Sequence, residues 1–360
     1  MRARTVWEKV APPADDAGDE AHVALSALLP TQHGRALREF HASTPLHSDT
    51  HAAADWAYPA QRYLDSGAAE YGARVATCDP HAIELGALGI AAFHATPAAL
   101  VTRERERHQP VSAARRALVR VNDALAPACD ALDIGLRLGQ EAGPAGFASL
   151  VLAFEGDGVD RLDVGARRRM LAAASVTGCL TAFGPLDERV RQEWWRLPVT
   201  RPPSPEEFVR LRPDDGARHD EFVVVNASTL EPLALTPRGG LIRPVSQLGQ
   251  VPLRRVAIGG CVGGDQDGLL HALEALERRP PHPEADVHLV PASEATFRRA
   301  EAAGWIERAH AIRVHVSPPS HLPAALDAAT SPCLGDGLVA SPLTLAASAH
   351  EGRLVPWEEP

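Results

Sequence analysis

The chain has 360 residues, enough for two or three domains, and a formal net charge of −10. This charge argues against nucleic acid or an anionic membrane as the main partner, because such surfaces are bound by clustered Lys and Arg. Lys9 is the only lysine, which argues against Schiff-base, pyridoxal-phosphate and Walker-type lysine chemistry.

Nothing in the sequence resembles a secretion signal or a membrane span. The first residues have no apolar core behind their charges, and no later stretch reaches the roughly 18 apolar residues that a span needs. We therefore expect a cytoplasmic protein. The five cysteines are odd in number and widely spaced, which favours reduced thiols over a disulfide framework.

Residues 1–115 are predicted to form a first α/β domain. A short apolar strand in it ends at the segment 78–81 (CDPH), and small residues after it predict a closely packed helix. Asp79 and His81, two residues apart at a strand end, suit proton transfer or metal binding. The alternative is a helix-capping Asp and an ordinary buried His. Upstream, His47, Asp49 and His51 alternate along the chain, which allows a metal site or a plain polar loop.

Three further segments complete the predicted organisation. Residues 116–200 are predicted to form a second α/β domain, with an apolar stretch at 147–154 and a helical pattern around 170–180. The Pro-rich segment 201–217 is predicted to be a linker. A third α/β domain, 218–360, is expected to open with a strand at 221–225 (EFVVV).

The clearest pattern of the third region is a βαβαβ run. It begins with a short apolar strand that ends at Gly259, followed by a glycine-rich turn and a helix with Leu at helical spacing. Two more strands are expected at 286–290 and 311–316, with a helix between them that Ser293 caps. Cys261 is thus expected at the carboxyl end of a strand, the usual ligand position of an open α/β sheet. The glycine spacing does not fit a dinucleotide-binding motif.

Several of these segments resemble the large subunit of 3-isopropylmalate dehydratase and the aconitase superfamily. The segment 78–81 followed by GALG is similar to the family's G-D-S-H and G-A-x-G motifs. Residues 228–232 (STLEP), 258–261 (IGGC) and 338–347 (LVASPLTLAA) are similar to S-T-L-E-P, I-G-S-C-T-N and the closing family motif. The resemblance implies three α/β domains around a central cleft, with the swivelling domain supplied by a separate small subunit.

The resemblance also implies a [4Fe-4S] cluster that three cysteines hold and whose open iron acts as a Lewis acid on the substrate. Cys261 and Cys333 match the first and last ligands, but Thr330 stands where the middle cysteine belongs. A hydroxyl is a far poorer cluster ligand than a thiolate, so an intact [4Fe-4S] cluster is not expected. A second hypothesis is that Cys78 joins Cys261 and Cys333 in an altered cluster or another metal site.

The function that the resemblance implies is hydro-lyase or isomerase chemistry on a small oxygenated acid, with Asp79 and His81 as the proton-transfer groups. By position, Ser175, Gly263 and Gly264 correspond to substrate-contacting residues of the family. The family's Asn-Arg pair is replaced around Gly263 and Gly264, so ordinary isopropylmalate or citrate chemistry is not expected. The alternative is a catalytically inactive homologue that serves as a ligand-binding or scaffold subunit.

Overall fold

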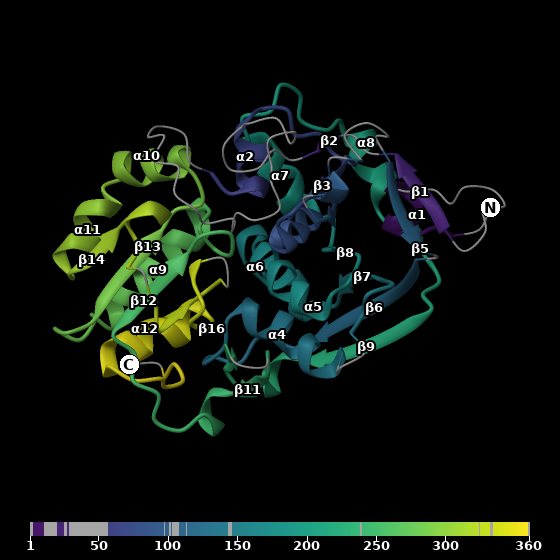
Figure 1. The fold of residues 1–360 in the computed structure, drawn as a ribbon. Coiled ribbons are helices and arrows are strands. Elements are labelled where there is room, and N and C mark those ends of the chain that lie inside the picture. The colour runs from purple at the N-terminus through teal and green to yellow at the C-terminus, as the bar shows by residue number, and fades with distance from the viewer. Residues whose placement is uncertain are drawn as a thin grey trace.

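Strands in three sheets, with helices packed against them, organise the computed structural model, and most of these strands run parallel (Figure 1). The mixed α/β class expected from the sequence is confirmed. The structure describes residues 3–10, 20–24, 27–28, 57–96, 98–100, 102, 108–112, 114–142, 146–237, 240–323, 325–331 and 334–358.

The first sheet has three parallel strands in the order β2-β3-β4, and strands β1 and β5 form a separate antiparallel pair. Helix α2 and the 3₁₀ helix η2, which replaces the expected ordinary helix after segment 78–81, pack beside the sheet. The elements are α1 (Val6–Val10), β1 (Glu20–Ala24), β2 (Ala27–Leu28), α2 (Pro59–Asp65), β3 (Arg74–Thr77), η2 (Pro80–Leu88), β4 (Ala91–His94) and β5 (His108–Ser112).

The second sheet has four parallel strands in the order β8-β7-β6-β9. Its apolar residues share one core with helices α4 and α6. The elements are β6 (Arg115–Asn122), α4 (Ala131–Ala142), β7 (Leu150–Glu155), α5 (Asp157–Asp160), α6 (Val164–Ala174), η4 (Ser175–Thr177), β8 (Thr181–Phe183), α7 (Glu188–Arg196), α8 (Pro205–Leu211), β9 (Glu221–Asn226) and η5 (Ala227–Thr229).

The third sheet has seven strands in the order β11-β10-β16-β15-β12-β13-β14, and helices α9 and α12 share its core. Figure 1 shows helix α6 between this sheet and the two others. The elements are β10 (Leu233–Leu235), β11 (Ile242–Pro244), η6 (Val245–Gln247), β12 (Arg255–Gly259), α9 (Gln266–Arg278), β13 (Asp286–Val290), α10 (Glu294–Ala302), α11 (Trp305–Ala311), β14 (Val314–Val316), η7 (Pro319–His321), β15 (Ala328–Ala329), β16 (Leu338–Ala340) and α12 (Pro342–Glu351).

The predicted βαβαβ run is confirmed as β12-α9-β13-α10-β14, with parallel pairing of its strands. The Asp265 side chain caps α9 by accepting from the N–H of Gly268, and Ser293 caps α10. The last strand starts at Val314 rather than at 311, because the residues before it form α11.

Two expectations about the middle of the chain are corrected. The strand expected to open the third region is β9, and it pairs with β6 in the second sheet. The predicted linker at 201–217 contains helix α8, which a capping box between Ser204 and Glu207 starts. Phe208 and Leu211 of this helix are buried in the same core as the first sheet. These two buried side chains attach the segment to the core, which its Pro-rich sequence does not indicate.

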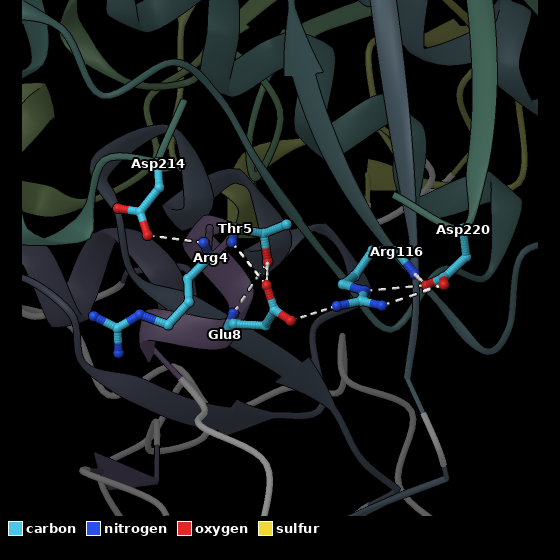
Figure 2. Close-up of polar contacts among 6 residues, drawn as sticks. All are labelled: Arg4, Thr5, Glu8, Arg116, Asp214 and Asp220. Atoms are coloured by element: carbon cyan, nitrogen blue, oxygen red, sulfur yellow. Dashed lines mark hydrogen bonds and ion pairs between the residues drawn. The ribbon is translucent and has the colours of Figure 1, made fainter. Parts of the chain in front are cut away.

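A polar cluster attaches helix α1 to the second sheet and to the segment before β9 (Figure 2). Glu8 accepts from the N–H of Thr5 at 2.8 Å and forms an ion pair with Arg116 of β6. Arg116 also contacts Asp220 through its Nε, at 3.0 Å. The backbone N–H of Arg4 donates to Asp214 at 2.8 Å. These contacts connect parts of the chain that lie more than 100 residues apart.

Candidate functional site

Asp79 and His81 follow strand β3, where the chain turns into helix η2. Asp79 is the N-cap residue of η2, and its carboxylate accepts from the backbone N–H of His81 at 2.9 Å. The capping role, one of the two interpretations of the sequence, is therefore real. It leaves the rest of the carboxylate available for chemistry, because a carboxylate has several acceptor positions.

The His81 ring is buried and held against the end of helix α6. Its Nδ1 lies 3.2 Å from the carbonyl oxygen of Ala172 and 2.9 Å from the Ser175 hydroxyl. A carbonyl oxygen only accepts, so this contact favours the tautomer with its proton on Nδ1, although the Ser175 hydroxyl can serve as donor or acceptor. Ser175, predicted to contact substrate, thus contacts His81.

Cys261 lies in the turn after strand β12, where three glycines adopt left-handed backbone conformations. The φ angles are 116° at Gly259, 75° at Gly260 and 76° at Gly263. Gly264 is needed for a different reason: a Cβ there would lie 2.3 Å from the carbonyl oxygen of Gly260. Gly263 and Gly264, predicted to contact substrate, therefore have a clear role in shaping the turn.

The structure brings Asp79 and His81 together with Cys261, which lies 180 or more positions further along the chain. One potential ligand atom from each lies within 4.8 Å of the other two, a spacing that would suit a metal ion if the sulfur of Cys261 were a free thiolate. Burial raises the pKa of Asp79, and the nearby His81 and His94 partly offset this effect. Cys261 is disulfide-bonded in this structure, whereas Cys78, Cys129 and Cys179 are free. The expectation that all cysteines are reduced is therefore wrong for Cys261.

Thr330, at the position of the expected middle cysteine, is buried and bound to the backbone. Its hydroxyl accepts from the N–H of Gly259 at 2.8 Å and lies 3.0 Å from the carbonyl oxygen of the same residue. The side chain thus holds the start of the Cys261 turn in place.

Among the described residues, the converging group offers the sulfur of Cys261 alone, whereas a [4Fe-4S] cluster is held by three thiolates. Cys78 is absent from the converging group and packs in the core of the first sheet. Burial raises the pKa of its thiol to about 11, which disfavours the thiolate that a metal would bind. Cys333 lies outside the described residues, as do the potential ligands His47, Asp49 and His51.

Sequence reasoning missed three consecutive arginines on helix α6, all of them buried. Each reaches a different carboxylate: Arg167 to Asp187 at 2.6 Å, Arg168 to Glu84 at 2.9 Å and Arg169 to Asp130 at 3.1 Å. A signal was present, because three adjacent residues span roughly 200° of a helix and cannot all face solvent on a helix with one buried side.

Arg168 and Glu84 line a narrow crevice beside Cys261. The crevice lies between helices α2, η2 and α6 on one side and the Cys261 turn on the other. Burial raises the pKa of the Glu84 carboxyl to about 7, an effect that Arg168 opposes. The residues that line the crevice include Tyr58, Gln61, Glu84, Arg168, Cys261 and Asp265.

Within the described part of the chain, no helix combines the length and apolar character that crossing a membrane requires. No family model matches the chain. Solved structures include a match to Thermococcus kodakaraensis aconitase X in its holo form. That match has a TM-score of 0.47 and 13% identity, and it covers 76% of this chain and 65% of that chain.

Curated sequences give clear relatives. Two 3-isopropylmalate dehydratase large subunits of Methanopyrus kandleri are 25% and 29% identical to this chain; the matches cover 62% and 67% of it and 57% and 60% of the relatives. A 3-isopropylmalate dehydratase large subunit of Thermotoga maritima is 27% identical over 60% of this chain and 49% of its own length. The chain therefore matches about half to three fifths of each relative. This sequence similarity makes the chain a divergent relative of 3-isopropylmalate dehydratase large subunits and supports a place in the aconitase superfamily.

Proposed function

We propose that the protein catalyses an acid–base addition or elimination, of the hydro-lyase or isomerase type, on a small oxygenated acid. The observation that carries this proposal is the convergence of Asp79 and His81 with Cys261. In the elimination direction, His81 Nε2 takes a proton from the carbon next to the carboxylate of the substrate. Asp79 gives a proton to the leaving hydroxyl group, a C=C bond forms, and water is released.

The environments of the two residues support these roles. The raised pKa of Asp79 favours its protonated form, which a general acid needs. The contact of His81 Nδ1 with the Ala172 carbonyl favours a ring whose Nε2 is free to accept a proton. Acid–base sites typically combine a proton donor and a proton acceptor in one buried place, as Asp79 and His81 would do here.

The proposal assigns no step to an iron-sulfur cluster, because Thr330 uses its hydroxyl on the backbone of Gly259. We infer a degenerate cluster site. The partner that we propose is a small subunit that would cover the cleft, since the relatives are named as large subunits. A cytoplasmic location and a role in a specialised pathway complete the proposal.

The test is a direct search for elimination. Protein purified without air is incubated with 2- and 3-hydroxy acids, and the conjugated acid product is followed by ultraviolet absorbance. Incubation in D₂O with detection by NMR reports the proton-transfer step even where water is not released. We expect His81→Gln and Asp79→Asn to lower the rate by about 100-fold or more. Asn is also a good N-cap residue, so Asp79→Asn should keep η2 intact.

The matched control is His315→Gln, the same change at an exposed histidine of β14, which should leave the rate unchanged. A wild-type protein that neither eliminates water nor exchanges deuterium would contradict the proposal and favour a scaffold role. Four irons and four sulfides per chain, with activity that depends on them, would contradict the inference of a degenerate cluster site.

A further inference from the structure

The crevice beside Cys261 has walls from different parts of the chain. Tyr58 and Glu84 lie on one wall with Arg168 of α6, and the turn that contains Cys261 forms the other wall. The backbone N–H of Tyr58 donates to the carbonyl oxygen of Ala292 at 2.9 Å, which closes one end of the crevice against the third sheet. The crevice is narrow.

Arg168 has one donor that no described residue uses. Its Nη2 donates to Glu84 at 2.9 Å and to Gln61 at 3.2 Å, and its Nη1 lies 3.8 Å from Asp265. Its Nε has no hydrogen-bond partner among the described residues, although the residue is only 8% exposed. Burial alone would lower the pKa of Arg168, but Glu84 and Asp265 hold it above its ordinary value, so the guanidinium keeps its charge.

Tyr58 presents a second unused donor to the same crevice. Its hydroxyl has no partner among the described residues, and the side chain is 3% exposed. Burial raises the pKa of this phenol, so it keeps its proton and remains a donor. A buried donor without an acceptor is costly, and a ligand that supplies an acceptor oxygen removes that cost.

The negative charges nearest to this place already have partners of their own. Asp79 accepts a backbone N–H at the start of η2, and Asp265 accepts one at the start of α9. Helix starts favour such charges. Glu84 is the direct ion-pair partner of Arg168. Two buried donors of residues that line the crevice, Arg168 Nε and the Tyr58 hydroxyl, therefore have no acceptor among the described residues.

We propose that Arg168 Nε and the Tyr58 hydroxyl bind a carboxylate group of the substrate. This inference rests on the proposed function for the identity of the site, and it names the group that the site recognises. Arg168 would supply the charge-assisted donor that is missing from the Cys261 turn, where Gly263 and Gly264 have no side chain to offer. The arginine comes from a different element, α6, on the opposite wall of the crevice.

The experiment measures binding without turnover. Acetate, malonate and L-malate are titrated into the full chain by calorimetry, with malamide as the uncharged counterpart of malate. We expect at least one of the three carboxylates to bind, and malamide to bind at least tenfold more weakly than malate if malate binds. Tyr58→Phe removes only the unpartnered hydroxyl, so it should weaken carboxylate binding about tenfold without loss of stability.

Two further variants serve as the control and as the test of the arginine. Tyr71→Phe is the matched control: its hydroxyl donates to the carbonyl oxygen of Phe208 at 3.1 Å, away from the crevice, so stability should fall while affinity stays the same. The double variant Arg168→Gln with Glu84→Gln removes both members of the ion pair, while Asp265 keeps its contact with the N–H of Gly268. It should weaken binding about 100-fold while circular dichroism reports a folded chain.

The proposal is overturned if no carboxylate binds, if malamide binds as well as malate, or if Tyr58→Phe and the double variant both bind like wild type. Carboxylate binding that depends on Tyr58 and Arg168, in a protein without elimination activity, would refute the proposed function and leave this inference standing. Elimination activity with unchanged KM and kcat in both variants would refute this inference and leave the proposed function standing.

Discussion

Replacing Thr330 by Val tests whether this residue has exchanged metal binding for a structural role. Valine has nearly the same shape but cannot take part in the two contacts with the backbone of Gly259, at 2.8 and 3.0 Å. The Gly259 N–H would be left buried without its acceptor, which costs about 1–3 kcal/mol of unfolding free energy. Because Val fills the same volume, little of this loss would come from packing.

Urea unfolding followed by circular dichroism measures the change, and Thr330→Ser is the matched control. Serine keeps the hydroxyl and loses one buried methyl group, which costs about 1 kcal/mol. We expect Val to destabilise the protein more than Ser does. The slope of the unfolding free energy against urea concentration should stay the same. If Val costs less than about 0.5 kcal/mol, or less than Ser, the hydroxyl does not stabilise the Cys261 turn and our reasoning is wrong.

Two further predictions concern the carboxylates of the crevice. The pKa of Glu84 is raised to about 7 in the folded protein, so its ionisation destabilises the fold as pH rises from the unfolded value toward 7. The difference in unfolding free energy between wild type and Glu84→Gln should therefore fall between about pH 5 and 7 and then level off. Urea titrations at each pH measure this difference. A difference that does not change with pH would contradict the prediction. Asp265→Ala should cost about 1 kcal/mol because the cap on Gly268 is lost, whereas Asp265→Asn should keep most of the stability; equal losses in thermal unfolding would count against the cap.

Local sequence patterns predicted the βαβαβ part of the third sheet. The apolar run before Gly259 and the leucine spacing after it identify β12 and α9, and Ser293 marks the start of α10. Such signals are local, because a strand, a helix period and a cap each involve residues close together in the chain. The same reasoning missed helix α8. Its Pro-rich sequence is typical of a linker, and the burial of its two apolar side chains depends on contacts with distant parts of the chain.

The candidate site was predicted in part, and by a different kind of evidence. Family resemblance, rather than any local pattern, indicated that Asp79, His81 and Cys261 face one cleft. The hydrogen bond between Ser175 and His81 follows from the contact of α6 with η2. The role of Thr330 could not be predicted, because its partner Gly259 lies 71 residues away.

By itself, the sequence determined the α/β class and the parallel strands around the Cys261 turn, since these depend on local periodicity. Only the tertiary structure decided that the arginines of α6 are buried. A run of charges is solvated unless carboxylates far away in sequence meet it, and here Glu84 and Asp130 do so. The same long-range packing left Tyr58 and Arg168 with donors that face the crevice.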